Sequence, residues 1–140
     1  MPINVLDLDD GLGVLIRADG DVSAKEFYDA IGQHLSKPDE RLKKYLYSVS
    51  DYTEVDKFEV NLSYIAKIAK RSVEIAKVNP DVVVITIVSK DFLFGIVKIW
   101  AGLAKLSGWN IKIFKQREEA YQWLKKQMSE KYKEIELTYK

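Results

Sequence analysis

Asp81–Ser89, with the sequence DVVVITIVS, is the stretch that decides the fold of this 140-residue chain. All seven inner residues are β-branched, and β-branched side chains fit the pleated surface of a strand. A continuous run of this kind is typical of a strand that is covered on both faces. We therefore predict that this segment is the central strand of a sheet, with helices packed on both sides of it.

The chain on either side of this segment alternates between strand-like and helix-like patterns. It opens with two short apolar runs joined by Asp9-Asp10-Gly11, which is typical of a β-hairpin. The order β-β-α-β-α-β-α-β-α predicts a single α/β domain, with a mixed, mostly parallel five-stranded sheet flanked by helices. The expected strands are Ile3–Leu8, Leu12–Ala18, Tyr45–Ser50, Val82–Val88 and Asn110–Phe114; the expected helices run from Ser23 to before Pro38, and over Lys57–Val78, Asp91–Ser107 and Gln116–Met128.

Local signals mark where the helices begin and end. Ser23 and Glu26 form a capping box, in which each side chain accepts a hydrogen bond from the other residue's N–H group. Asp56 and Glu59 have the same spacing and predict a second such helix start. Proline cannot continue a helix, so Asn79-Pro80 is expected to end the long helix. We expect turns or loops at Asp19–Asp21 and Asp51–Asp56, and a charged connector at Lys37–Lys44.

Composition excludes several kinds of function. The net charge is +1, from 22 basic and 21 acidic residues, which argues against nucleic acid as a partner. The chain has no cysteine and a single histidine, His34, so neither thiolate chemistry nor a multi-histidine metal site is expected within one chain. The first residues, MPINVLDLDD, do not resemble a signal peptide, and no apolar run is long enough to span a membrane. We expect a cytoplasmic protein without cofactor or metal.

Three features that resemble functional motifs are interpreted as structural. Asp7, Asp9 and Asp10 lack the further oxygen ligands of a calcium loop, so they are assigned to the hairpin turn. Gly11-Leu12-Gly13 leads into a strand, whereas a dinucleotide-binding fingerprint leads into a helix. His34 has no acidic partner or cleft indicated for catalysis, and it lies near the end of a predicted helix, where a cation is favourable.

The predicted helix Asp91–Ser107 is apolar around most of its circumference. One stripe of side chains is widened by a second, and few residues of the helix are charged. A helix that faces water should be polar over half its surface, so this one needs additional cover. Three interpretations remain open: burial in the core, contact with a second subunit or an apolar ligand, and a peripheral membrane contact. The first stripe is Phe92, Ile96, Ile99, Leu103 and Leu106, the second is Phe94, Val97, Trp100 and Ala104, and the interface candidates are Phe92, Phe94, Val97 and Trp100.

Polar residues follow two of the predicted strands. In open α/β sheets, ligands bind beyond the carboxyl ends of the strands, so these residues are candidates for binding a ligand or partner. The same residue types are also the caps and turns that such a fold requires. A small hydrolase built on this cluster is a further alternative. The candidates are Ser50, Asp51, Tyr52, Asp56, Ser89, Lys90 and Asp91.

A family resemblance follows from the element order together with the segment Phe114–Leu124, FKQREEAYQWL. It contains a short strand with a Phe, acidic residues that open a helix, then Ala and an aromatic-Leu pair. Over about Ile3 to Met128 the chain resembles the STAS domains of anti-sigma-factor antagonists and sulphate-transporter tails, and within them the SpoIIAA-like family. STAS domains are non-enzymatic modules that bind partner proteins, sometimes with nucleotides or lipids, so the resemblance implies an interaction module.

The phosphorylation switch of that family is not expected here. The switched antagonists carry Asp-Ser-Ser-Gly at the start of the helix after the third strand, and the segment compared with it is Thr53–Glu59. Asp56 fits the acidic position, but Lys57 and Phe58 occupy the places of the serines. A switch that adds charge at a helix N-terminus would therefore lack its acceptor.

These observations lead to one preferred function and two alternatives. We predict a non-catalytic module, residues 1–130, that self-associates as a homodimer and binds a protein partner. The alternatives are a carrier of a small apolar ligand or lipid, and the hydrolase named above. The tail, residues 131–140, has Ile135, Leu137 and Tyr139 in alternation, which predicts an edge strand within the subunit or one that pairs with another subunit.

Overall fold

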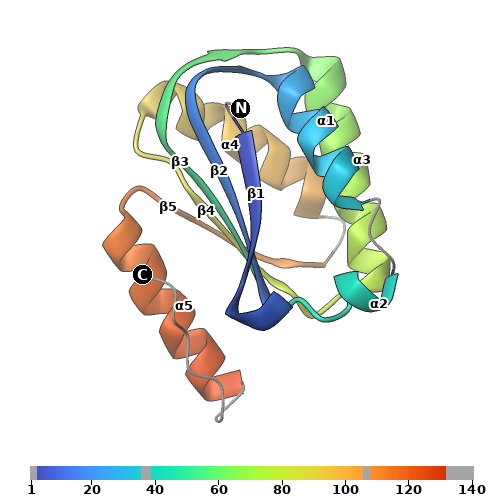
Figure 1. Cartoon of the computed structure of the whole chain (residues 1–140). Helices are drawn as coiled ribbons and strands as arrows, with labels where there is room; N and C mark the ends of the chain where they lie inside the picture. The colour runs from blue at the N-terminus through green and yellow to red at the C-terminus, as the bar shows by residue number, and fades with distance from the viewer. Residues whose placement is uncertain (1–2, 36–38, 106–107, 132–140) are drawn as a thin grey trace.

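The computed structural model describes residues 3–35, 39–105 and 108–131. A five-stranded sheet carries helices on both faces, which confirms the predicted α/β architecture; α5 and the α1–α3 pair lie on opposite sides of it (Figure 1). The predicted tail lies outside the described residues. The strands are β1 (Ile3–Leu8), β2 (Gly13–Ser23), β3 (Tyr47–Glu59), β4 (Val83–Ile87) and β5 (Asn110–Phe114); the helices are α1 (Ala24–Leu35), α2 (Asp39–Leu42), α3 (Leu62–Val78), α4 (Asp91–Ala104) and α5 (Arg117–Lys131), with the 3₁₀ turn η1 (Asp9–Gly11).

The strands lie in the order β1-β2-β3-β4-β5. The first two are antiparallel and the remaining pairs are parallel, as the hairpin and the alternating units predicted. Every residue of β4 is buried, so the prediction that this strand is covered on both faces is confirmed. The prediction that it is the central strand is wrong, because β3 occupies the middle of the sheet and β4 lies between β3 and β5.

The strands β2 and β3 extend well beyond their predicted ends, and this corrects two expected turns. They pair in parallel as far as Ser23 and Glu59, with irregularities of register at two points, and Gly20 has a φ of +69°. Val22 and Val55 on this extension are buried. The ring of Phe27 in α1 packs against Tyr52 and Phe58, at 4.9 and 5.6 Å between ring centroids. A few apolar side chains therefore hold an extension whose other residues are mostly polar.

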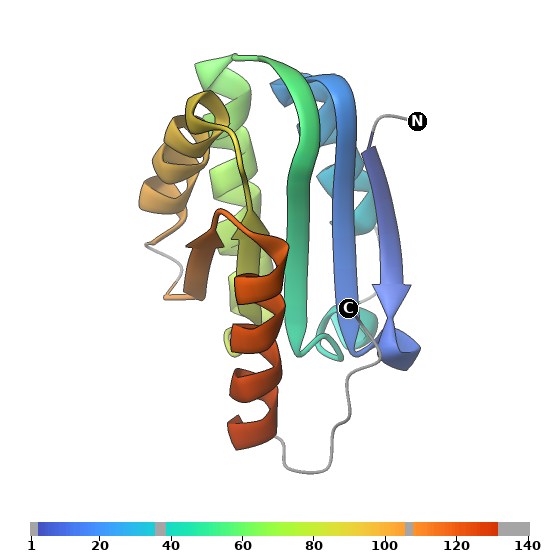
Figure 2. The same cartoon turned by 90° about the vertical axis from the view of Figure 1, so that its left-hand side faces the viewer.

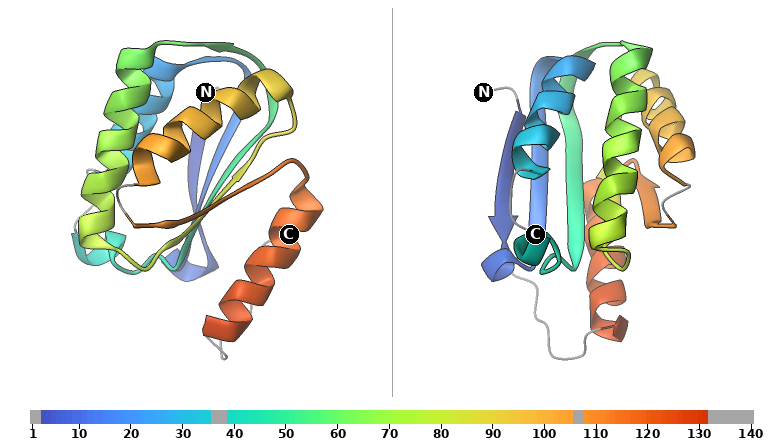
Figure 3. Two further views of the ribbon diagram at one scale, coloured as in Figure 1. Left: turned by 180° about the vertical axis from the view of Figure 1, so that it is seen from behind. Right: turned by 90° about the vertical axis from the view of Figure 1, so that its right-hand side faces the viewer.

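Two layers of helices complete the core. On one face α1, α3 and α4 pack together, and α4 contacts α3 (Figure 3). On the other face α5 lies against β3 and β4 (Figure 2), with the predicted residues Ala120, Leu124 and Met128 buried and Trp123 partly buried. Residues of one strand alternate between these two layers. Side chains at neighbouring positions of β3 therefore reach different environments.

Of the two predicted helix starts, the one at Ser23 is confirmed and the one at Asp56 is wrong. Glu26 accepts a hydrogen bond from the Ser23 N–H at 3.0 Å, and Ser23 Oγ accepts one from the Glu26 N–H at 3.2 Å, so the capping box is confirmed. The second predicted pair, Asp56 and Glu59, lies within β3 instead. The N-cap of α3 is Asn61, and α3 ends at Val78, immediately before Asn79-Pro80 as predicted.

Two of the three aspartates at the first turn, Asp7 and Asp9, are held by side chains from the α2–β3 region. Asp7 accepts hydrogen bonds from Arg41 and from the hydroxyl of Tyr45. Asp9, whose φ is +50°, accepts one from the hydroxyl of Tyr47. Burial, together with this contact to Asp9, raises the pKa of Tyr47 above its ordinary value. The acidic cluster thus forms the hairpin turn that was predicted.

Gly13 is required by the packing of Tyr47 against β2, which gives a prediction for stability. A Cβ on Gly13 would lie 2.0 Å from Cζ of the Tyr47 ring. We expect Gly13→Ala to lower the free energy of unfolding by about 2 kcal/mol, because the ring must move. Denaturant titration measures this.

The matched control is Gly32→Ala, because Gly32 lies inside α1 and its Cβ would contact nothing within 4 Å. Alanine is favoured over glycine within a helix, so this variant should gain roughly 0.5–1 kcal/mol. Equal effects of the two substitutions would contradict the packing argument.

Candidate functional site

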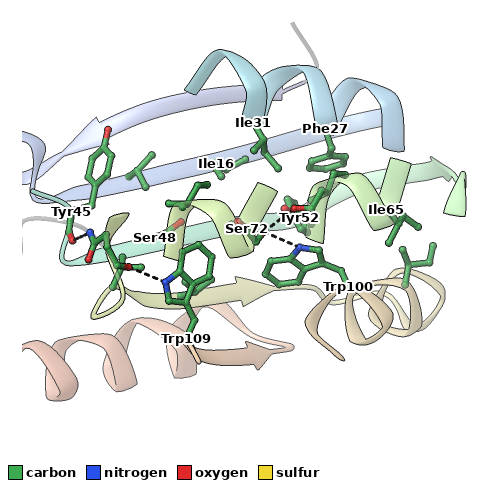
Figure 4. A pocket seen from close by; sticks show the side chains of 18 of the residues that line it. Ile16, Phe27, Ile31, Tyr45, Ser48, Tyr52, Ile65, Ser72, Trp100 and Trp109 are labelled. Atoms are coloured by element: carbon green, nitrogen blue, oxygen red, sulfur yellow. Dashed lines mark hydrogen bonds between the residues drawn. The ribbon is translucent and has the colours of Figure 1, made fainter. Parts of the chain in front are cut away.

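An apolar pocket of about 130 Å³ lies between the sheet and the layer formed by α1, α3 and α4 (Figure 4). Its floor includes Val14, Ile16 and Val84 from β2 and β4. Three aromatic side chains, Phe27, Trp100 and Trp109, belong to its walls. This volume is similar to that of a cavity of about 150 Å³ that binds benzene. The pocket is therefore large enough for a small apolar molecule.

Regular spacing in the sequence places the side chains of the pocket. In α3 they recur every three or four residues, which puts them on one face of the helix: Ile65, Ile68, Ser72 and Ile75. In β3 they recur every second residue, so that Ser48, Ser50 and Tyr52 all face the helices. Hydroxyl groups from a strand and a helix thus lie within an otherwise apolar surface.

Several polar groups of the pocket are paired within the protein. Ser72 Oγ donates to the carbonyl of Ile68 at 3.0 Å and accepts from Trp100 Nε1 at 3.4 Å. Trp109 Nε1 donates to the carbonyl of Asn79 at 3.0 Å. Asn79 Nδ2 in turn donates to the carbonyls of residues 42 and 45, at 2.9 and 2.7 Å. These bonds connect α3, α4 and the segments that flank the sheet.

Ser72, Asn79 and Trp109 were missed as site residues in the sequence. Ser72 interrupts the apolar stripe of α3 at a position that the helical period assigns to the interior, and this signal could have identified it. Asn79 was interpreted only as part of a helix stop. Its side chain contacts residues more than thirty positions away, so no local pattern indicated these contacts.

Ser50 and Tyr52 belong to this pocket rather than to the end of a strand. Both were predicted as strand-end residues, but β3 continues to Glu59. Burial raises the pKa of Tyr52 to about 12, while a hydrogen bond with Ser50 acts in the opposite direction. Tyr52 is therefore a neutral phenol at physiological pH, and it adds no charge to the pocket.

Asp51 lies on the opposite face of β3, where it binds the first residue of α5. Its carboxylate accepts from Arg117 Nε at 2.8 Å and from the Thr53 hydroxyl at 2.7 Å. Burial acts to raise the pKa of Asp51, but the hydrogen bonds from Arg117 and Thr53 outweigh it, and the pKa is lower than usual. The alternation of β3 therefore separates Asp51 from Ser50 and Tyr52.

The remaining strand-end candidates lie at the surface. Lys90 donates to the carbonyl of Val55 and lies 3.3 Å from the Asp56 carboxylate. Asp91 lies 3.4 Å from Lys115, and Ser89 is exposed. Six of the seven predicted residues are thus divided among the pocket, the α5 face and two surface ion pairs, and Ser89 belongs to none of these groups. They do not converge on one cleft, whereas the hydrolase alternative requires them to do so.

The helix α4 directs most of its interface candidates toward the core. Val97 is buried, and Phe94 and Trp100 pack on the core, which agrees with the interpretation of core burial for these three residues. Phe92, the fourth interface candidate, is 47% exposed, and Ile99 and Leu103 are 50% and 46% exposed. The periodicity showed that both stripes need cover, but it gave no information on which of them faces the sheet.

The observed start of α3 also changes the comparison with the phosphorylation motif of the family. The segment compared with that motif, Thr53–Glu59, lies in β3, so its residues do not begin a helix. The first turn of α3 contains Ser63, which is exposed. The absence of a serine switch stays a prediction, because the comparison was made with the wrong residues.

Neither a metal centre nor a membrane-spanning helix is found in the described part of the chain. No group of three or more Asp, Glu, His or Cys side chains there is arranged to hold a metal ion. No helix in this part of the chain combines the length and the apolar character needed to cross a membrane. The side chain of His34, which was predicted to be structural, lies outside what the structure describes.

Comparison with known proteins supports the fold. No protein-family model and no curated protein sequence matches the chain. Among solved structures, it is similar to an uncharacterized protein of the DUF3478 family with a SpoIIAA-like fold, from Shewanella loihica PV-4. The match covers 87% of this chain and 91% of that one, with a TM-score of 0.54 and 17% sequence identity. The SpoIIAA-like fold expected from the sequence is thus confirmed.

The ion pair between the buried Asp51 and the partly exposed Arg117 gives a prediction for the pH dependence of stability. A carboxyl group whose pKa is lowered by folding stabilises the protein above its unfolded pKa of about 3.9. That contribution is lost as the pH falls from there through the folded pKa. We expect Asp51→Asn to reduce the free energy of unfolding at pH 7 by about 2 kcal/mol. The variant should also lose stability less steeply below pH ~4.

Denaturant titrations at a series of pH values measure both effects. Asp91→Asn is the control, because the Asp91 side chain is 93% exposed and its ion pair should contribute less than about 1 kcal/mol. An Asp51→Asn variant as stable as the wild-type protein at pH 7 would contradict this role.

Proposed function

We propose that this SpoIIAA-like domain is a non-catalytic module that binds a small apolar molecule between its sheet and the layer of α1, α3 and α4. The observation that carries the proposal is the pocket of about 130 Å³, which is lined mainly by aliphatic and aromatic side chains. Ligand sites are typically concave and mostly apolar, with a few polar groups, and this pocket has that composition.

The energetic cost of the pocket supports the same proposal. An empty cavity of about 130 Å³ destabilises a protein by about 3 kcal/mol at roughly 24 cal/mol per Å³. Larger side chains at floor positions such as Val14 and Val84 would reduce that cost. A ligand would recover part of it by restoring contacts with the walls, so binding of an apolar molecule stabilises the fold.

Toluene tests this proposal, because it is close in size to benzene and has no hydrogen-bonding group. The three tryptophan indole N–H signals in a ¹H–¹⁵N spectrum report its position. Trp100 and Trp109 line the pocket, whereas Trp123 packs against Phe114 on the α5 side of the sheet. We expect toluene to shift the first two signals in a saturable way and to leave the signal of Trp123 unchanged.

Filling the pocket should abolish these shifts. Val84→Phe should weaken toluene binding by at least about tenfold. Ile68→Phe, on the helical wall, serves if the first variant does not fold. Val60→Phe is the matched control, because Val60 is 50% exposed and lies outside the pocket. Absence of shifts in the wild-type protein, or equal shifts of all three indoles, would refute the proposal.

A second candidate function is self-association through the outer face of α4. Phe92, Ile99 and Leu103 lie on this face and are about half exposed. Gly95 and Gly102 lie among them, and a Cβ on either would meet nothing within 4 Å, so another surface can approach the helix closely. An exposed apolar patch of this kind is typical of an interaction site.

Ile99→Asp tests this second candidate. If α4 is the interface, the wild-type protein is a dimer by native mass spectrometry and the variant is a monomer, because a charge would be buried without a partner. Leu62→Asp is the control, since Leu62 is 65% exposed at the start of α3 and should not affect the dimer. A monomeric wild-type protein would reject self-association.

A further inference from the structure

Among the residues that the structure describes, no charged side chain lines the pocket between the sheet and the helices. None of its lining residues is Asp, Glu, Lys, Arg or His. The carboxylate of Asp51 lies on the same strand as the pocket serines but faces α5, where Arg117 binds it. A charged ligand would lose its hydration without gaining a counter-ion, so the pocket discriminates against ions.

Most hydrogen-bonding side chains of the pocket already have protein partners. The hydroxyl of Ser72 bonds to the Ile68 carbonyl and to Trp100, and the Trp109 indole bonds to Asn79. Ser50 is engaged with Tyr52. A ligand that displaced any of these bonds would have to replace it.

Ser48 is the exception in the part of the chain that the structure describes. Its neighbours across the sheet are Val14 in β2 and Val84 in β4, and all three residues line the pocket. Its side chain is only partly buried, and no hydrogen-bond partner of its hydroxyl is found among the described residues. One donor and acceptor group thus lies at the centre of an apolar floor (Figure 4).

From this arrangement we infer that the pocket selects an uncharged, mostly apolar molecule with one hydrogen-bonding group, which Ser48 binds. The inference rests on the proposed ligand-binding function and names the ligand's chemical class. The apolar walls contribute contact with the body of the ligand, and Ser48 fixes its orientation. A polar group bonded to Ser48 would satisfy a hydroxyl for which the described residues provide no partner.

Three molecules of similar size separate the parts of this inference: toluene, phenol and benzoate. At pH 7 phenol is neutral and can hydrogen-bond, toluene is neutral and cannot, and benzoate is an anion. We expect phenol to bind about tenfold more tightly than toluene, which corresponds to one net hydrogen bond. Benzoate should bind more weakly than toluene. Titrations followed by the indole signals of Trp100 and Trp109 give all three dissociation constants.

Ser48→Ala should reduce the affinity for phenol to that for toluene and leave toluene binding unchanged. Ser50→Ala is the matched control. Ser50 lies two residues from Ser48 on the same strand and lines the same pocket, but it already bonds to Tyr52. It should keep most of the preference for phenol. The Trp123 indole signal and thermal unfolding verify that both variants are folded.

The outcomes distinguish this inference from the proposed function. If toluene binds but phenol is not preferred, or if Ser48→Ala keeps the preference, the role of Ser48 is refuted while ligand binding stands. Equal affinities for benzoate and phenol would refute the selection against charge. If none of the three molecules binds, the proposed function itself fails.

Discussion

The alternation of side chains along β3 is the constraint on which the other features of this structure depend. This strand lies in the middle of the sheet, and each of its residues faces one of two helical layers. Ser48, Ser50 and Tyr52 face α1, α3 and α4, whereas Tyr47, Val49 and Asp51 face α5. A shift of one residue in register would exchange these sets, burying a carboxylate among apolar side chains and moving the serines to α5. The register of β3 therefore determines both the pocket and the anchoring of α5.

The two layers are held to the sheet in different ways. On the α5 side the contact is a tight apolar one, completed by the buried pair of Asp51 and Arg117. On the other side three helices cover the sheet, and the aromatic residues Trp100 and Trp109 bridge between elements by hydrogen bonds without filling the space. The pocket thus lies in the layer built from several helices. There, a hydrogen bond from an indole can hold the position of a helix where close packing does not.

Much of the fold could be predicted from the sequence because its signals are local. The run Val82–Val88, the capping box at Ser23 and the stop at Asn79-Pro80 each depend on neighbouring residues, and the structure agrees with them. The extension of β2 and β3 was missed because its stability comes from contacts of Val22 and Val55 with residues distant in sequence. The Asp-Gly composition there indicated turns, and tertiary packing overrode that preference. The same limit applies to the pocket, since no local pattern shows that α3 and α4 leave space above β3.

The orientation of α4 connects the pocket to the surface of the molecule. Leu93, Val97 and Ala104 are buried, while Phe92, Ile99 and Leu103 lie on the outer side of the same helix. From the sequence, this apolar helix was a choice between core burial, contact with a subunit or an apolar ligand, and a membrane contact. A helix has two sides, so these roles do not exclude one another: the inner side completes a pocket wall through Ile96 and Trp100. The outer side is an apolar surface whose exposed residues do not line the pocket. Since different residues form the two sides, the proposed ligand binding and the proposed self-association depend on separate sets of side chains in one helix.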